Sequence, residues 1–292
     1  MATLKDVKRK IAGVKKTKQI TKAMNMVAAS RLRGAQSKME AFRPYAIKFL
    51  DVLENLSKRT TNEASQLLIP KEKVENVLII LCTSDRGLCG GFNTNLVESV
   101  DKFVNANTFN PLFINFGKKG RDWCKREKHK IVGEYIGVVG SKFDYNIASE
   151  AGIIAIEKYL NGDYDEVYLV YSKFVSMSKQ IPTISKILPI HNLSKKEESD
   201  ESEDYIAEYL YEPKVNELLE AMLPKNIYVQ LFSALLETST SEHAARMLAM
   251  DNASKACNDM IEELSLAYNK ARQAAITKEL MDIVGGAEAL KG

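Results

Sequence analysis

Residue types that would place this chain in a specialised class are scarce. It has only 4 cysteines in 292 residues, and no two of them form a Cys-x-x-Cys pair, so a disulfide scaffold is excluded and a reducing compartment is indicated. Glycine (15 residues) and proline (7 residues) are also infrequent, which leaves room for long helices. No run approaches the roughly 18 apolar residues that a membrane-spanning helix needs, so any membrane role is expected to be peripheral.

Patterns of catalytic or metal-binding residues are equally sparse. His129, His191 and His243 show no ligand spacing, and no acid-base pair stands out. Cys89 follows a basic residue near an expected helix start, which could activate a thiol, although a packed thiol is the simpler interpretation. The Gly-rich segment 84–91 follows a strand, where phosphate loops occur, but it matches neither common nucleotide-binding pattern. We therefore expect no catalytic, metal-binding or cofactor-binding residues.

Charge is distributed unevenly along the chain. The total is +3, but residues 1–48 carry thirteen Lys and Arg against only Asp6 and Glu40, a net +11, which leaves −8 for the rest. A basic segment of this density favours an anionic partner, which could be nucleic acid, anionic lipid or an acidic protein surface. No aromatic residue precedes Phe42, which argues against stacking on single-stranded nucleic acid.

A heptad repeat dominates the first sixty residues. Apolar side chains recur at the a and d positions from Leu4 to Leu56, with polar exceptions only at Lys18, Thr21 and Asn25. This periodicity predicts a helix that supercoils against a partner, with a kink or short interruption at Pro44. A second apolar stripe runs from Met247 to Ala275 within an expected helix from about Pro213 to Ala289. The two helices can pair with each other as an antiparallel coiled coil, or each can pack on a compact core.

The middle of the chain changes to an alternating pattern of strands and helices. Strands are expected at 77–83, 112–116, 131–139, 166–171 and 181–190, the last one antiparallel, with helices at 93–104, 118–128 and 147–160. Such alternation predicts a mainly parallel sheet of βαβ units. The expected fold class is thus α+α/β, a long antiparallel coiled coil of N- and C-terminal helices with an inserted Rossmann-like α/β domain.

The expected boundaries follow from these patterns. They are an N-terminal coiled-coil helix at 1–60, an α/β domain at 74–192, an acidic flexible loop at 193–208 and a C-terminal coiled-coil helix at 209–292. The loop contains the charged low-complexity stretch Lys195–Glu208.

Four segments, in order along the whole chain, resemble one known family, the gamma subunits of F-type ATP synthase. They are Lys18–Ser30 in the first helix, Thr83–Gly91 in the centre, Tyr209–Pro213 at the entry to the last helix, and Tyr268–Ala287 near the C-terminus. Because the family-like sequence begins at Leu4, the resemblance also argues against a cleaved transit peptide.

The resemblance implies a rotor subunit without chemistry of its own. Members of the family form an asymmetric shaft inside a hexamer of alpha and beta subunits, and their foot rests with the epsilon subunit on the membrane-embedded c ring. Ion flow through the ring turns the shaft, which changes the nucleotide affinities of the beta subunits. Expected partners are therefore alpha, beta, epsilon and the c ring, without nucleic acid, at the cytoplasmic face of a bacterial inner membrane.

The family's contact positions can be carried over to this sequence. Contacts with beta-subunit loops, or couplings between the two helices, are implied for Met24, Arg246, Arg272, Gln273, Thr277 and Glu279. Foot contacts with epsilon and the c ring are implied for Tyr209 and Glu212.

Two other function classes remain open from the residues alone. A nucleic-acid-binding coiled coil would bind DNA or RNA with a steep salt dependence. A nucleotide-dependent α/β enzyme would bind ATP or NAD tightly as an isolated chain, but the weak Gly-rich loop argues against it.

Overall fold

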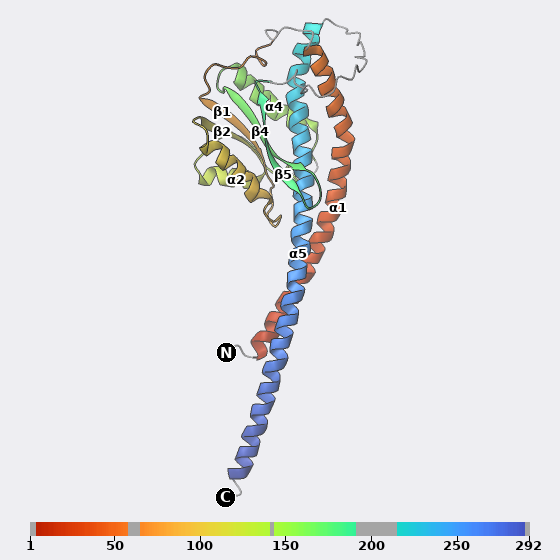
Figure 1. The fold of residues 1–292 in the computed structure, drawn as a ribbon, viewed down its shortest axis with the longest axis vertical. Helices are drawn as coiled ribbons and strands as arrows, with labels where there is room; N and C mark the ends of the chain where they lie inside the picture. The colour runs from red at the N-terminus through yellow and green to blue at the C-terminus, as the bar shows by residue number, and fades with distance from the viewer. Residues whose placement is uncertain (1–3, 58–64, 141–142, 191–214, 290–292) are drawn as a thin grey trace, which may run out of the picture. The chain divides into compact units, whose positions relative to one another are not determined.

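The computed structural model describes residues 4–57, 65–140, 143–190 and 215–289 (Figure 1). They form two compact units, a larger one at Ser30–Ala245 and a smaller one at Met1–Ala29 with Arg246–Gly292. The two terminal helices each contribute to both units. The elements in chain order are α1 (Leu4–Ser57), β1 (Asn76–Cys82), α2 (Phe92–Asn105), β2 (Asn110–Phe116), α3 (Lys118–Arg126), β3 (Lys130–Tyr135), α4 (Tyr145–Leu160), β4 (Glu166–Phe174), β5 (Gln180–Leu188) and α5 (Val215–Ala289).

The larger unit is built on a five-stranded sheet with the order β3-β2-β1-β4-β5. The first four strands are parallel, and β5 pairs with β4 in antiparallel orientation. Six of the seven residues of the central strand β1 are fully buried, as expected for a continuous apolar run covered on both faces. The expected βαβ architecture is therefore confirmed.

Side chains of β1 alternate between two hydrophobic cores. Leu78 and Ile80 belong to a core that includes residues of α4, α5 and the end of α1. Val77, Ile79 and Leu81 belong to a second core with residues of α2 and α3. Figure 1 shows the same layering, with α2 on one side of the sheet and α4 with α5 on the other. The sheet is thus covered on both faces.

In the larger unit, α1 and α5 lie side by side as part of the first core. Leu53 and Leu56 near the end of α1 are completely buried in the same cluster as Leu219 and Leu223 near the start of α5. The ring of Phe42 meets that of Phe232 edge to face, with centroids 4.8 Å apart. The start of one helix therefore packs beside the end of the other, which is the antiparallel arrangement.

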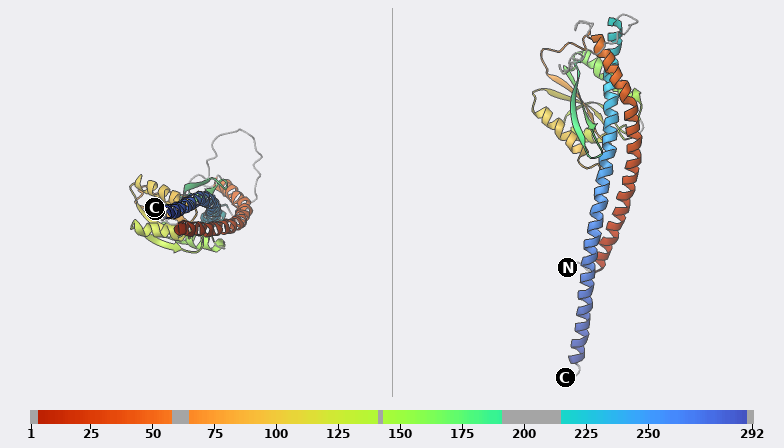
Figure 2. Two further views of the ribbon diagram at one scale, coloured as in Figure 1. Left: turned by 90° about the horizontal axis from the view of Figure 1, so that it is seen from below. Right: turned by 45° about the vertical axis from the view of Figure 1, so that its right-hand side comes forward.

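The smaller unit contains a second stretch of the same antiparallel pair. Thr21 contacts Ser254, and Asn25 contacts Met247, so residue numbers rise along one helix as they fall along the other. All heptad a and d positions of α1 are buried or partly buried, which confirms the predicted seam. On α5 the described side chains after Ala275 are exposed. Figure 1 and the right-hand view of Figure 2 both show that α5 continues past the N-terminal end of α1.

Two details differ from the expected elements: the interruption, one of the two outcomes expected at Pro44, is absent, and one strand is shorter. First, α1 runs through Pro44 without interruption. Pro44 lies on the exposed side of the helix, so only one backbone hydrogen bond is lost there while the buried side stays intact. Second, β3 ends at Tyr135 and does not reach Val139. Gly137 has a φ of 82°, a left-handed conformation that ends an extended strand.

Candidate functional site

The carboxyl ends of the parallel strands are where a sheet of this kind would bind a ligand. Here the segment after β1 occupies that edge itself. The three N-terminal amides of α3 donate to it: Lys118 N to the Asp85 carboxylate at 3.0 Å, Lys119 N to the Ser84 carbonyl at 3.0 Å, and Gly120 N to the Thr83 hydroxyl at 2.8 Å. These amides would otherwise form an anion site, so the chain's own loop fills it.

The close fit at this edge depends on one glycine. Gly117 precedes α3 with a φ of 92°, and a Cβ built there would lie 2.2 Å from the Thr83 carbonyl oxygen. Asp85 extends the network, because its carboxylate also accepts the Gly137 amide at 2.9 Å. One carboxylate therefore joins the loops that follow three neighbouring strands. The segment 84–91 is a structural turn, in agreement with the preferred interpretation of the sequence.

The thiols of the larger unit are packed rather than poised for chemistry. Cys89 is 2% exposed and accepts a hydrogen bond from the Asn93 side chain at 3.1 Å. Burial raises the pKa of the Cys82 thiol, and it raises the pKa of Cys124 to about 11. A thiol whose pKa is raised carries less of the reactive thiolate at neutral pH.

The two histidines in the described part of the chain, His129 and His243, do not come together in a site. The ring of His129 packs against Phe113 and Trp123, and burial lowers its pKa. His243 is buried in α5 beside Glu242, and His191 lies outside the described residues. Among residues 4–57, 65–140, 143–190 and 215–289, no three His, Cys, Asp or Glu side chains gather as a metal cluster.

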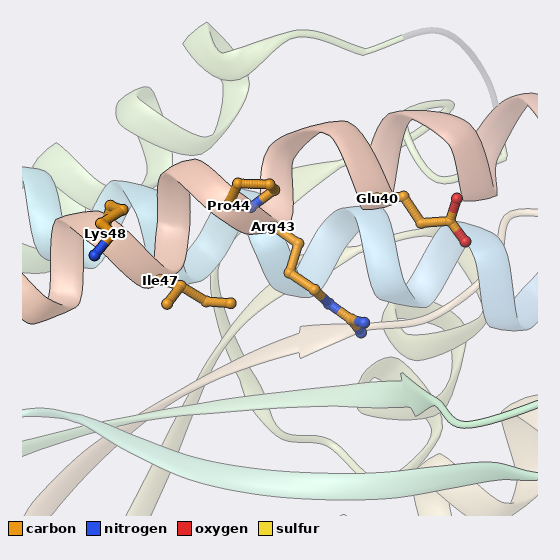
Figure 3. A pocket seen from close by; sticks show the side chains of 5 residues that line it. All are labelled: Glu40, Arg43, Pro44, Ile47 and Lys48. Atoms are coloured by element: carbon orange, nitrogen blue, oxygen red, sulfur yellow. The ribbon is translucent and has the colours of Figure 1, made fainter.

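One surface hollow lies on α1 alone. It has a volume of about 370 Å³ and is lined by Glu40, Arg43, Pro44, Ile47 and Lys48 (Figure 3). All five side chains come from successive turns of one helix, and all are exposed. An open hollow on one helix surface offers no enclosed polar groups to orient a substrate.

The remaining candidate is the surface of the paired helices in the smaller unit. Met24 and Arg246 are partly buried where the two helices are paired. Arg272, Gln273, Thr277 and Glu279 are exposed on α5, near and beyond the level at which α1 begins. The 26 residues from Arg246 to Arg272 correspond to roughly 40 Å along a helix, so the structure separates the candidates into two groups. Tyr209 and Glu212 lie outside the described residues.

The end of α5 has an unusual surface for an exposed helix. Ile276, Leu280, Met281, Ile283 and Val284 are all about half exposed or more. Exposed apolar side chains that follow each other along one segment mark a surface for contact with another molecule. No helix in the described part of the chain is both long and apolar enough to cross a membrane.

Comparison with known proteins assigns the chain to a family. A family model described as ATP synthase matches residues 3–290. The chain is 60% identical to the ATP synthase gamma chain of Desulfosudis oleivorans, with 100% of both chains covered. It is 54% identical to that of Desulforapulum autotrophicum, with 99% of this chain and 100% of the relative covered. The chain belongs to the ATP synthase gamma chain family.

Solved structures agree with this assignment at the level of the fold. The rotor of the Euglena gracilis mitochondrial ATP synthase superposes with a TM-score of 0.67 at 21% identity, covering 94% of this chain and 98% of that one. The central stalk and c-ring structure from Tetrahymena thermophila gives a TM-score of 0.57 at 26% identity, covering 80% and 99%. A gamma chain is a non-catalytic subunit, which fits the self-filled sheet edge.

Two features of the structure, one in each unit, were not singled out as functional from the sequence. Lys18, Thr21 and Asn25 interrupt the apolar heptad and predict a polar layer in the seam. They do not predict its partners on α5, because those depend on the axial register of the two helices. The hydrogen bonds that Asp85 accepts also have no local sequence signal, because they join loops that are distant in sequence.

Proposed function

We propose that this chain is the central shaft of a rotary ATP synthase and carries torque between a membrane c ring and a catalytic alpha/beta hexamer. The family assignment and the rotor and central-stalk structures of similar fold support this role. The observation that carries it is the apolar end of α5, which continues beyond the start of α1 as an exposed helix. Lys278, Glu279 and Asp282 are also exposed on this segment, but residues 283–287 carry no charge. An uncharged stretch cannot form lasting ion pairs and is suited to turning inside a surrounding collar.

The paired helices suit torque transmission because two wound helices resist bending and twisting more than one. Shaft asymmetry is equally important for function. A shaft that touched three catalytic subunits equally would not change their relative nucleotide affinities, because only a difference in contact free energy shifts an equilibrium. In the smaller unit, two helices side by side give way to one, so the surface around the shaft axis is uneven.

The carried-over residues take different roles in this proposal. Arg272, Gln273, Thr277 and Glu279 are exposed, which favours contacts with loops of the surrounding beta subunits. Met24 and Arg246 are partly buried beside the helix seam, which favours coupling between α1 and α5.

At the other end of the shaft, Tyr209 and Glu212 are proposed to meet the epsilon subunit and the c ring. The proposed location is the cytoplasmic face of a bacterial inner membrane, with membrane contact only through these partners. Because 191–214 lie outside the described residues, the support here is the sequence resemblance alone.

Co-expression with alpha and beta subunits tests the proposal. We expect a defined complex that contains one copy of this chain and hydrolyses ATP. A chain that stays monomeric while alpha and beta assemble without it would contradict the role. Binding of the isolated chain to DNA that persists near physiological salt would instead support the nucleic-acid alternative.

A sharper test examines rotation directly. A cysteine placed at Met281, on the exposed end of α5, can be cross-linked to a cysteine in the surrounding collar. We expect the cross-link to stop or strongly slow ion-coupled ATP synthesis, with activity restored by reduction. Full coupled synthesis with the cross-link intact would exclude rotation of this segment as a requirement.

A further inference from the structure

A polar layer interrupts the apolar seam of the smaller unit. Lys18, Thr21 and Asn25 occupy three successive seam positions of α1, and each is buried or partly buried. Thr21 is only 8% exposed. A polar side chain at a seam position lowers the stability of a coiled coil but can specify which register the helices adopt.

The first contact of this layer joins two hydroxyl groups. Thr21 Oγ1 lies 2.8 Å from Ser254 Oγ on α5. Thr21 Oγ1 also donates to the carbonyl of Lys18 in its own helix at 3.0 Å. Because a hydroxyl group has one hydrogen, Ser254 is the donor across the seam. The bond therefore depends on hydroxyl groups at both positions.

The second contact joins a side chain of α1 to a backbone carbonyl of α5. Asn25 Nδ2 donates to the carbonyl oxygen of Met247 at 2.8 Å. A helix carbonyl is fixed relative to the helix axis and cannot follow a change of side-chain rotamer. This bond consequently defines the axial position of α5 against α1, whatever side chain residue 247 carries.

Within the smaller unit, the repeating apolar part of the seam does not define that position by itself. Because the pattern repeats every seven residues, a slip of one heptad, roughly 10 Å, again brings seam positions opposite each other. Such a slip would place Thr21 opposite Met247 or Ile261 instead of Ser254. The hydroxyl would lose its partner inside the seam, and Asn25 would lose its carbonyl.

We propose that Thr21, Asn25 and Ser254 form a register key that fixes the axial register of α1 against α5 in the smaller unit, which contributes no residue to the first hydrophobic core. The register key adds a structural detail to the proposed rotor function, and its effect on torque transmission rests on that proposed function. Torque that acts on one helix is passed to the other without sliding, because each slipped register strands buried polar groups.

Disulfide trapping in the full chain can report the register. The Thr21–Ser254 pairing, continued by one heptad along both helices, places Val14 opposite Ile261. The pair V14C/I261C therefore reports the native register, and V7C/I261C reports a slip of one heptad. Both pairs are made in a C257A background, since Cys257 is partly buried on the same seam.

The key is removed by T21V, N25L and S254A together. We expect V7C/I261C oxidation to rise roughly tenfold over the parent, since each lost hydrogen bond no longer penalises the slipped register. Thermal stability is expected to be equal or higher, because apolar side chains strengthen a seam. In the assembled complex, ATP hydrolysis is expected to continue while ion pumping per ATP falls.

Two controls separate register from general packing. The exchange I11L/L264I alters apolar side chains at opposing seam positions and is expected to leave both cross-links and coupling unchanged. S254T keeps the hydroxyl and is expected to retain the native register, whereas S254A alone is expected to show part of the slip.

The outcomes distinguish the key from the rotor function. Exclusive V14C/I261C oxidation in the triple variant overturns the register key, and so does a triple variant that fails to fold, because the key predicts an equally stable seam. If the register slips while ion pumping stays fully coupled, the key stands and the torque-transmitting role is contradicted.

Discussion

Glu237 on α5 accepts a hydrogen bond from the backbone amide of Phe174, the last residue of β4, at 3.2 Å. One helical turn later, Ser241 donates to the carbonyl of Ser172 at 3.0 Å. Strand β1 pairs with β4 only as far as Val170. Two helix side chains therefore bond to backbone groups of β4 past the end of that pairing, and they fasten α5 to the sheet of the larger unit.

This fastening predicts different effects for two substitutions of Glu237. Glu237→Ala leaves the Phe174 amide without its acceptor and is expected to destabilise the larger unit by about 1–3 kcal/mol. Glu237→Gln keeps an acceptor oxygen and is expected to be tolerated. Thermal unfolding and hydrogen exchange of the Phe174 amide measure both, and equal behaviour of the two variants would contradict the fastening role.

The same carboxylate predicts a pH dependence. Burial raises the pKa of Glu237, although the Phe174 amide, Lys173 and Arg43 partly oppose the shift. A raised pKa means that the folded state favours the protonated form, so its contribution to stability is present at low pH and is lost as the pH rises through the folded-state pKa. We therefore expect the free energy of unfolding of Glu237→Gln, measured relative to wild type, to be higher at pH 7 than at pH 4. A constant difference across this range would be inconsistent with the shift.

Asp165 is expected to behave in the opposite way. Burial alone would raise its pKa, but the amides of Asn76 and Glu75 and the Lys71 ammonium outweigh burial and lower it. Its stabilisation is therefore present above the ordinary pKa of aspartate, about 3.9, and is lost as the pH falls through the lower folded-state value. Asp165→Asn should cost about 1–3 kcal/mol at pH 7 and progressively less in acid, as measured by denaturant unfolding.

Gly152 tests the packing of α4 against α5. A Cβ at this position would lie 2.4 Å from Cδ1 of Tyr228, so Gly152→Ala is expected to destabilise by about 1–3 kcal/mol. Gly34 in α1 is a matched control, because its Cβ would meet nothing within 4 Å. Gly34→Ala is expected to stabilise by about 0.5–1 kcal/mol through helix propensity. Effects of the same sign would contradict the close approach of Tyr228.

Thr83 tests the self-filled edge of the sheet. Its hydroxyl donates to the Phe116 carbonyl at 3.2 Å and accepts the Gly120 amide. Thr83→Val preserves shape but leaves the Gly120 amide without its acceptor, while the Phe116 carbonyl keeps the Thr83 backbone amide at 2.8 Å. The expected loss is about 1–3 kcal/mol in the free energy of unfolding. Thr94→Val on the exposed surface of α2 is the comparison, expected to stay within about 0.5 kcal/mol of wild type. Unchanged stability in Thr83→Val would show that the edge does not depend on this hydroxyl.

The long helices, their seam and the order of elements in the larger unit could be predicted from the sequence because these features have local periodic signals. Heptad spacing predicts that Leu32, Met39 and Leu53 face inward, and all three are buried. The apolar run of β1 predicts a strand covered on both faces in the same way. Pro44 does not interrupt α1, because one missing amide on an exposed helix face does not break a helix held by its seam.

The sequence by itself thus determined that two amphipathic helices precede and follow an α/β domain along the chain, since side-chain periodicity follows directly from backbone geometry. Only the tertiary structure decided the strand order, the pairing of Thr21 with Ser254, and the use of the α3 amides by Thr83 and Asp85. These contacts join residues far apart in the chain, and a repeating seam allows several registers of similar apolar burial. The register of the helices and the filling of the sheet edge by the chain's own loop therefore depend on a few hydrogen bonds whose partners meet only after folding.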